Sequence, residues 1–345
     1  MKILVPTFRS DTGNDVYFRD LKDGLNRHHI TIEIMPLTKY LEFTPCLAGA
    51  ALRRGSQVSD CSLVHTNADY GTVFKAPGKP YVVTAHHDVF DPPYQNCTNF
   101  AQKAYHYGLL KRRIAQALND ADRIVAVSCS TKASLERTFG VTRIDVIHNG
   151  VDTDVFRPRQ VPTPPEFGDK IKLLFVGNLI KRKGADLLPQ IMERLGGRYV
   201  LFHTGPPRFS RTRAVSLGRV SRDRLPQIFN MCDIFLFPSR LEGFGYAVAE
   251  AMACGKPVVC TDCSSLPELV VDKKGGFLCE RDNVEQFAEN IRVLAGDAGL
   301  RASMGEFNRK RIVENFTLDK MAEGYSRLYR DVLRADSGVK GLQPI

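Results

Sequence analysis

Short runs of strand-forming residues alternate with helix-length segments along nearly the whole chain. The runs are rich in Val, Ile and Leu, which is typical of strands buried on both faces of a sheet. Such an alternation predicts an α/β protein with parallel sheets covered by helices on both faces. The expected strands are Lys2–Pro6, Thr31–Ile34, Leu63–His65, Tyr81–Ala85, Arg123–Ser128, Ile144–His148, Lys172–Gly177, Tyr199–Thr204, Ala214–Gly218, Ile234–Pro238, Pro257–Thr261 and Gly276–Cys279.

A proline-rich stretch separates the strands into two sets of six. Arg157–Pro165 carries four prolines within eight residues, which prevents regular structure and indicates an interdomain linker. A length of 345 residues also suits two domains. We therefore expect two Rossmann-like doubly wound domains that face each other, with a shared cleft at the carboxyl ends of the strands as the site.

Composition narrows the class of protein. The chain is 43% hydrophobic and 25% charged, as in an ordinary globular protein. The apolar run at the start, MKILVPTFRSD, is too short for a signal peptide. No run reaches the about 18 apolar residues of a membrane span, so we expect a cytoplasmic protein. A net charge of +10 favours anionic partners: nucleotides, nucleic acid or anionic lipid, the last as a peripheral contact at the inner face of the membrane.

Two short motifs suggest metal or redox chemistry, but simpler interpretations are available. Cys260 and Cys263 form a Cys-x-x-Cys, yet no second pair or nearby histidines complete a zinc site, and we interpret them as small residues filling a corner between strand and loop. Asp152-Thr153-Asp154 is an Asp-x-Asp, which turn chemistry explains. We predict no required metal and no cofactor.

The stretch SRLEGFGYAVAEAMACGKP carries the most specific signal. A strand ends at Pro238, and a helix from Tyr246 to Cys254 follows, so Leu241–Gly245 is a strand-to-helix loop. Glycines in this loop let backbone approach a ligand, and the unpaired amides of Phe244 to Val248 at the start of the helix form an anion site suited to a diphosphate.

Two glutamates flank this anion site. Glu242 lies before the turn and Glu250 about one helical turn inside the helix, so both can reach a ligand with a diphosphate in its middle and a hydroxyl-bearing ring at each end. Taken singly, Glu242 is explained by a solvated loop and Glu250 by a favourable charge in a first helical turn. The pair together with the glycines favours the ligand interpretation.

These residues resemble the Glu-x7-Glu motif of glycosyltransferase family 4, retaining enzymes of GT-B fold that use nucleotide sugars. An ordered series of further segments is similar to the family, from ADRIVAVS (121–128) and IHNGVD (147–152) to FVG (175–177) with Lys183-Gly184, and then CD (232–233) before FLFPSRLEGFG. The resemblance implies an N-terminal acceptor-binding domain, residues 1–157, on which a C-terminal helix of about 320–345 packs back. It implies a nucleotide-sugar-binding domain over residues 158–319.

The resemblance also assigns roles to side chains. Glu250 is expected to hold the ribose and Glu242 the hydroxyls of the transferred sugar. Lys183, between a strand and a helix, has the reach and charge to meet the pyrophosphate. His86 is expected to approach the sugar, with His87 as the alternative. The catalytic candidates are thus His86, Lys183 and Glu242.

The expected donor-binding residues are Gly13, Asn178, Arg182, Lys183, Val220, Glu242, Gly243, Phe244, Gly245, Tyr246, Ala247 and Glu250. Two of them depart from the family pattern. Asn178 stands where the family usually has arginine, which removes one cation that Arg182 or Lys181 would have to replace. Gly13 stands alone where relatives have a Gly-Gly pair.

The resulting prediction is a retaining glycosyltransferase that moves a hexose from a UDP-, GDP- or ADP-sugar to a glycan, lipid or small-molecule acceptor. One alternative is another enzyme of similar architecture, such as a nucleotide-sugar epimerase; an NAD enzyme is disfavoured because no Gly-x-Gly-x-x-Gly follows a strand. The other is a basic nucleic-acid-binding protein, but no known binding module accompanies the basic residues, and we expect no nucleic-acid partner.

Overall fold

The computed structural model describes residues 1–8, 13–38, 49, 57–162, 165–207 and 213–340, which form two compact units. The first unit is Met1–Gly150 with Leu318–Ile345, and the second is Val151–Thr317. The division thus falls a few residues before the expected boundary at 157. The reason is that Val151 already pairs with Thr317 and Phe156 is fully buried against Phe229, both in the second unit.

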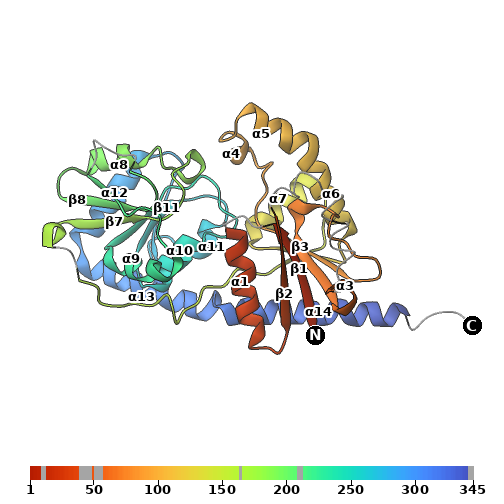
Figure 1. Ribbon diagram of the computed structural model, residues 1–345. Helices are drawn as coiled ribbons and strands as arrows, with labels where there is room; N and C mark the ends of the chain where they lie inside the picture. The colour runs from red at the N-terminus through yellow and green to blue at the C-terminus, as the bar shows by residue number, and fades with distance from the viewer. Residues whose placement is uncertain (9–12, 39–48, 50–56, 163–164, 208–212, 341–345) are drawn as a thin grey trace, which may run out of the picture. The chain divides into compact units, whose positions relative to one another are not determined.

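The first unit contains a six-stranded sheet in the order β2-β1-β3-β4-β5-β6, with every pair parallel. Its strands are β1 (Lys2–Phe8), β2 (Thr31–Leu37), β3 (Leu63–Asn67), β4 (Tyr81–Ala85), β5 (Arg123–Ala126) and β6 (Ile144–Val146). Its helices are α1 (Gly13–Asn26), α3 (Gln57–Asp60), α4 (Pro92–Gln95), α5 (Phe100–Tyr105), the π-helical turn η3 (His106–Leu110), α6 (Lys111–Asp120), α7 (Cys129–Phe139) and α14 (Leu318–Lys340). These elements are labelled in Figure 1 where there is room.

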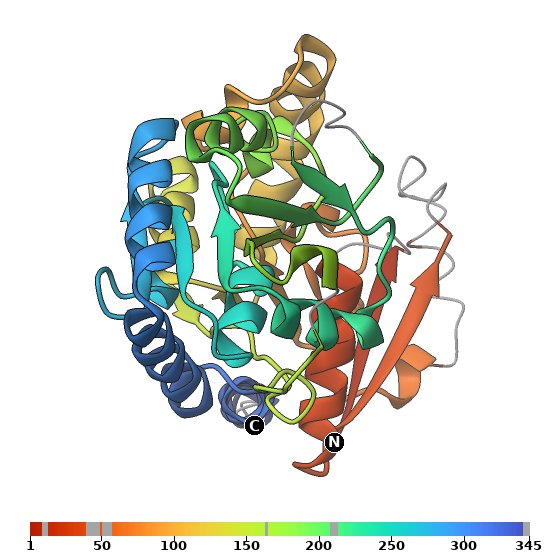
Figure 2. The ribbon, with the colours of Figure 1, turned by 90° about the vertical axis from the view of Figure 1, so that its left-hand side faces the viewer.

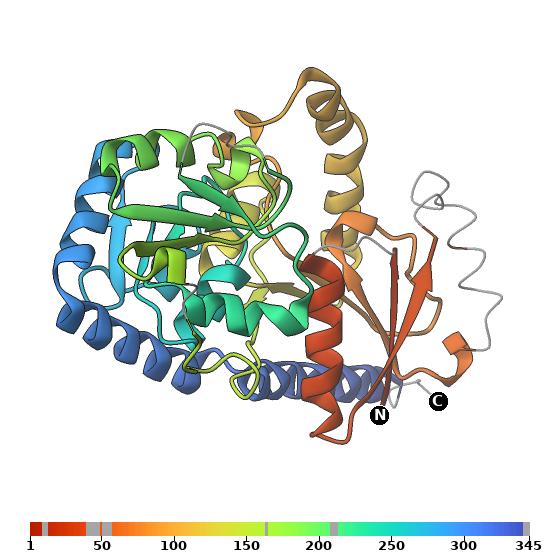
Figure 3. The ribbon, with the colours of Figure 1, turned by 60° about the vertical axis from the view of Figure 1, so that its left-hand side comes forward.

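Helices cover both faces of this sheet. Alternate residues of β1 point to opposite faces, so Ile3 and Val5 pack with α1 and α14, whereas Leu4 packs with α6 and α7. Figures 1 and 3 both show α14 (blue) running past α1 (red). The C-terminal helix therefore completes the core of the first unit.

The second unit contains a six-stranded parallel sheet in the order β12-β11-β10-β7-β8-β9. Its strands are β7 (Ile171–Phe175), β8 (Tyr199–His203), β9 (Ala214–Ser216), β10 (Ile234–Phe237), β11 (Val258–Thr261) and β12 (Gly276–Cys279). Its helices include α8 (Leu188–Leu195), α9 (Leu225–Met231), α10 (Tyr246–Ala253), α11 (Leu266–Leu269), α12 (Val284–Gly296) and α13 (Ala298–Asn315). Figure 2 shows α12 and α13 (blue) along one side of these strands.

The strand orders locate the candidate sites. All twelve expected strands are present, with ends shifted by at most a few residues, and both sheets are doubly wound as expected. The order reverses between β1 and β3 in the first sheet and between β7 and β10 in the second. Ligands of such sheets bind beyond the carboxyl ends of the strands at this reversal. In the second unit, the candidate ligand site therefore lies at the loops after β7 and β10.

Candidate functional site

The loops that follow β7 and β10 bring Lys183 and Glu242 together. Lys183 ends a short 3-10 helix, η5 (Lys181–Lys183), and its Nζ lies 2.6 Å from Oε1 of Glu242. The two side chains are only 18% and 8% exposed. The ammonium also lies 5.1 Å from the centroid of the Phe237 ring, at the end of β10. The sequence analysis placed both residues at this edge of the sheet but did not foresee that they pair with each other.

Tight packing between the two loops explains why the pair forms. Gly184 has a φ of +71°, and a Cβ at this position would lie 2.0 Å from the carbonyl oxygen of Pro238. Only glycine allows that approach. The loops are further joined by Arg182, whose guanidinium donates to the carbonyl of Leu241 at 2.7 Å and whose carbonyl accepts from the amide of Arg240 at 2.8 Å.

The Glu242 carboxylate is held in its ionised form. Burial alone would raise the pKa of this carboxyl, but the charges of Lys183 and Arg182 lower it below its usual value. Ser239 Oγ also donates to Oε1 at 2.5 Å, and Arg182 Nη1 lies 3.7 Å from the same oxygen. Burial lowers the pKa of the Lys183 ammonium, and the charge of Glu242 opposes that only in part. The site therefore presents a desolvated cation beside a carboxylate that is already hydrogen-bonded.

Arg240 is a component of the site that the sequence analysis missed. Its guanidinium makes a bidentate pair with Asp186 at 2.7 and 2.9 Å, donates to Asp282 at 2.7 Å and donates to the carbonyl of Lys181. These contacts fix η5 against the loop after β10, and bidentate geometry is specific to arginine. No local sequence signal identifies this role, because its partners lie 54 and 42 residues away.

The start of α10 follows the expected pattern in part. Gly245 caps the helix in the left-handed conformation, with a φ of +95°. A Cβ at Gly245 would lie 3.1 Å from the Leu266 side chain, so both the backbone conformation and the packing favour glycine there. The amide of Val248, which the sequence analysis expected to be unpaired, donates to the carbonyl of Gly245 at 3.0 Å. Phe244 is buried, whereas Gly243, Tyr246 and Ala247 are half-buried.

Glu250 lies deeper in α10 and has its own cation. Its side chain is 5% exposed, and Oε1 lies 3.4 Å from Nη1 of Arg222. The Arg222 guanidinium also lies 5.7 Å from the centroid of the Phe156 ring. The two glutamates of the motif are thus each paired with a basic residue, Glu242 with Lys183 and Glu250 with Arg222. Arg222 is a second residue that sequence reasoning missed.

The remaining donor-binding candidates of the second unit are Asn178 and Val220. Asn178 is exposed in the segment between β7 and η5, and its carbonyl accepts from the amide of Ile180 at 2.8 Å. Val220 is half-buried in the segment between β9 and α9. No hydrogen bond of the described residues joins the Asn178 side chain to Lys183 or Glu242. The assignment of Asn178 and Val220 to donor binding stays a prediction.

The candidates that lie in the first unit are His86 and Gly13. His86 follows β4, its Nε2 lies 2.9 Å from Oδ1 of Asn67, and its ring packs edge-on against Tyr17 with centroids 4.6 Å apart. Burial, with a smaller contribution from the neighbouring His87, lowers the pKa of His86 to about 3, so the imidazole is neutral at physiological pH. Gly13 begins α1, and the preceding residues 9–12 of the expected glycine loop lie outside the described residues.

A buried polar network supports this edge of the first sheet. His65 Nε2 and Nδ1 lie 2.7 Å from Thr84 Oγ1 and from the hydroxyl of Tyr329, and Tyr325 joins Thr84 at 3.0 Å and Tyr17 at 2.5 Å. The network ties α14 to β3, β4 and α1. It also places Tyr17 under His86, which explains how the imidazole is oriented.

The Cys-x-x-Cys and the Asp-x-Asp of the sequence analysis make packing and turn contacts. Cys260 and Cys263 are buried at the end of β11, and Cys263 Sγ contacts the carbonyl of Ser239 at 3.2 Å, in agreement with a packing role. Asp152 accepts from the amides of Asp154 and Val155 at 3.0 Å, which is the expected turn geometry.

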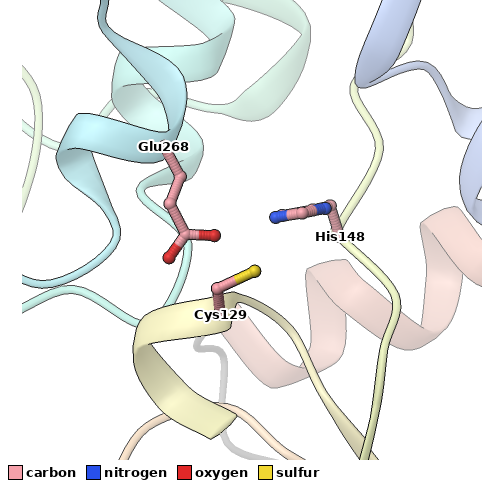
Figure 4. A group of neighbouring side chains, drawn as sticks. All are labelled: Cys129, His148 and Glu268. Carbon is pink, nitrogen blue, oxygen red and sulfur yellow. The ribbon is translucent and has the colours of Figure 1, made fainter. Parts of the chain in front are cut away.

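One further group contains potential metal ligands. Cys129, at the start of α7, and His148, which follows β6, have ligand atoms within 4.8 Å of each other in the first unit (Figure 4). Cys129 and His148 together supply two ligand atoms, whereas a zinc site has three or four protein ligands. Glu268, also drawn in Figure 4, belongs to the second unit.

Comparisons with known proteins agree with this architecture. The family model "Glycosyltransferase Family 4" matches residues 3–155, and the model "Glycosyl transferases group 1" matches residues 210–311. An uncharacterized glycosyltransferase of Methanocaldococcus jannaschii is 30% identical over 225 residues, which are 63% of this chain and 61% of that protein. The D-inositol 3-phosphate glycosyltransferase of Mycobacteroides abscessus is 33% identical over 247 residues, 63% of this chain and 54% of that protein. The chain thus spans little more than half the length of these relatives.

Solved structures show the same fold at low identity. The sucrose-phosphate synthase of Thermosynechococcus elongatus superposes with a TM-score of 0.84 at 19% identity, covering 97% of this chain and 99% of that one. Anabaena HepE in complex with UDP-glucose gives a TM-score of 0.75 at 19% identity, over 96% and 100% of the two chains. The two matched family models support a glycosyltransferase of the family 4 type, and the two doubly wound parallel sheets and these neighbours show the GT-B fold.

Proposed function

We propose that the protein transfers a hexose from a nucleotide-diphosphate sugar to an acceptor hydroxyl, with retention of the anomeric configuration. The buried Lys183–Glu242 pair, 2.6 Å apart at the strand-order reversal of the second sheet, is the observation that carries the proposal. A desolvated ammonium beside a helix N-terminus is a suitable seat for a diphosphate. Relatives with glycosyltransferase names support the reaction class.

The proposed chemistry begins with the departure of the nucleotide diphosphate. Cleavage of the bond between the anomeric carbon and the phosphate oxygen leaves its electron pair on that oxygen, while positive charge develops on the sugar. Lys183 and the backbone amides before Val248 stabilise the new negative charge, and such fixed donors are the main lever in reactions of this type. The protein would therefore accelerate the step by electrostatics at the leaving group.

Bond formation follows on the same face of the sugar. The acceptor hydroxyl oxygen attacks the anomeric carbon from the side of the leaving group, and its proton passes to the departing phosphate oxygen. Glu242 orients the hydroxyls of the transferred sugar, and Glu250 binds the ribose of the nucleotide. Neutral His86 is proposed to hydrogen-bond the sugar from the first unit; its low pKa, about 3, leaves it uncharged. No metal is assigned to any step.

The names of the relatives suggest a broad class of acceptor. The curated relatives include a D-inositol 3-phosphate glycosyltransferase and a GDP-mannose-dependent phosphatidylinositol monomannoside mannosyltransferase. A glycan, lipid or small-molecule acceptor is therefore proposed, with UDP-, GDP- or ADP-sugar as donor. A cytoplasmic location belongs to the same proposal, and it is supported by the free thiols of the described cysteines.

A thermal-shift screen with UDP, GDP, ADP and their sugars tests the proposal. We expect one nucleotide class to raise the melting temperature, Lys183→Ala to abolish that shift and Glu250→Ala to weaken it. Lys274→Ala, at an exposed lysine of the same unit, is the matched control and should keep the full shift. Hydrolysis of the stabilising donor, followed by NMR of the released sugar, then reports the stereochemistry. Melting that is insensitive to every nucleotide in the wild type would refute the proposal.

A further inference from the structure

A buried asparagine, Asn67, lies beside His86 at the carboxyl edge of the first sheet. Asn67 is the last residue of β3 and is 1% exposed. The parallel register pairs it with Thr84 of β4, so His86, two residues beyond Thr84, emerges next to the end of β3. Both side chains are therefore near the strand-order reversal between β1 and β3, where ligands of such sheets bind.

The contact between these side chains determines which imidazole nitrogen carries the proton. Oδ1 of Asn67 lies 2.9 Å from Nε2 of His86. An amide oxygen can only accept a hydrogen bond, so Nε2 is the protonated nitrogen. Burial, with a smaller contribution from His87, lowers the pKa of His86 to about 3, so the imidazole holds a single proton at physiological pH. Nδ1 is therefore unprotonated and can only accept.

The opposite end of the Asn67 amide agrees with this orientation. Burial raises the pKa of the Tyr70 hydroxyl, and Thr7 and then Asn67 oppose the rise, because Nδ2 lies toward that hydroxyl. Nδ2 itself makes no hydrogen bond of normal geometry within the described residues. A buried donor without a partner is uncommon and costs free energy, so the retention of an amide here indicates a functional constraint.

The His86 ring is also held from a second direction. Tyr17 packs edge-on against it, with ring centroids 4.6 Å apart and an interplanar angle of 79°. The Tyr17 hydroxyl is anchored in turn, 2.5 Å from that of Tyr325. In the part of the chain that the structure describes, the hydrogen bond of His86 is the one at Nε2, and the side chain is half-buried. Nδ1 is thus fixed in place and accessible to a ligand.

We propose that Asn67 is a positioning residue that holds His86 as the Nε2–H tautomer, so that Nδ1 accepts a hydrogen bond from a hydroxyl of the transferred sugar. The inference rests on the proposed sugar transfer for the identity of that hydroxyl. An unprotonated nitrogen attracts an O–H donor, whereas it repels the ionised oxygens of a diphosphate, which carry lone pairs and no proton. The tautomer therefore directs His86 to the sugar and away from the phosphates of the donor.

Side-chain ¹⁵N NMR of the ligand-free protein tests the tautomer. The signals that disappear in His86→Gln are those of His86 among the eight histidines. We expect Nε2 to be protonated in the wild type, with a proton that exchanges slowly with water, and Asn67→Leu to lose this slow exchange. Gln95→Leu is the matched control, because it removes another buried amide, 3.2 Å from Nδ1 of His106, and should leave the His86 signals unchanged. A wild-type His86 protonated at Nδ1 would overturn the proposal.

Ligand titration and donor hydrolysis connect the tautomer to the reaction. The stabilising nucleotide sugar should shift the Nδ1 resonance of His86, whereas its nucleoside diphosphate alone should not. Asn67→Leu should keep the nucleotide-induced melting shift, lower kcat about tenfold or more, and change the donor KM by less than about twofold. Asn67→Asp lacks Nδ2 but keeps an acceptor for Nε2–H, so it should retain most of kcat.

The kinetic outcomes separate this inference from the proposed function. Circular dichroism first establishes native melting of each variant. Wild-type kcat in a folded Asn67→Leu variant, or a loss in Asn67→Asp as large as in Asn67→Leu, would contradict the positioning role. A wild type that no nucleotide stabilises would instead refute the sugar transfer, and NMR of the ligand-free protein would still decide the tautomer of His86.

Discussion

Removal of either member of the buried Lys183–Glu242 pair should destabilise the second unit. Lys183→Met keeps the apolar stem against Phe237 but leaves the Glu242 carboxylate with only Ser239 and the more distant Arg182. Breaking a fully buried ion pair from one side costs about 3–5 kcal/mol in unfolding free energy. Because Lys183 is 18% exposed and Arg182 lies 3.7 Å from the carboxylate, we expect a smaller cost than that range, about 2–3 kcal/mol.

Glu242→Gln, together with the double variant, separates the interaction energy of the pair from the interactions of each residue with its other neighbours. Glu242→Gln leaves an ammonium without a counter-charge in a site where burial already lowers the pKa of Lys183, and it should cost a similar free energy. The double variant removes both charges. It should therefore be less destabilised than the sum of the two single variants, by about 2 kcal/mol.

The measurement is urea unfolding of the wild type, the two single variants and the double variant. The chain contains no Trp, so circular dichroism and tyrosine fluorescence are the probes. The two units can unfold separately, and the transition of the second unit is the one compared. Lys181→Met, at an exposed neighbouring lysine, controls for the loss of one surface charge. Single variants within about 0.5 kcal/mol of the wild type, with an additive double variant, would refute the reasoning.

Three further changes test the geometry of the site. Gly184→Ala should destabilise the protein by more than the ~1–2 kcal/mol cost of a left-handed alanine, because its Cβ would clash with Pro238; Gly78→Ala, with a φ of +68° and open space, should show only the conformational cost in thermal melts. Arg240→Lys should cost about 2 kcal/mol, since lysine cannot replace the bidentate contact, and a nucleotide-induced melting shift should shrink with it; an unchanged stability and shift would contradict its positioning role. Glu242 has a folded pKa below its ordinary value of 4.5, so its stabilisation is present above pH 4.5 and lost as pH falls through the folded pKa. Urea titrations below pH 4.5 should show the wild type losing stability more steeply than Glu242→Gln, and parallel curves would exclude the effect.

Local patterns in the sequence were sufficient to predict the regular elements. Runs such as Ile234–Phe237 are buried and rich in β-forming residues, and each expected strand is present. The helix after the Glu-x7-Glu loop ends at Ala253, close to the expected stop before Gly255 and Pro257. These signals are local, since strand burial and helix termination depend on neighbouring residues. The first boundary between units was less accurate, because the packing of Phe156 on Phe229 is not a local property.

The sequence by itself thus determined the two α/β domains, the family resemblance and the positions of Lys183, Glu242 and Glu250 in loop or helix. Only the tertiary structure decided which charges meet. Lys183 and Glu242 are 59 residues apart and Arg222 and Glu250 are 28 apart, and neither separation has a helical or strand period that would predict contact. The pairing of Lys183 with Glu242 follows from the order β10-β7 in the sheet and from the close approach of Gly184 to Pro238. Long-range electrostatic contacts are set by topology and packing, which local sequence patterns do not encode.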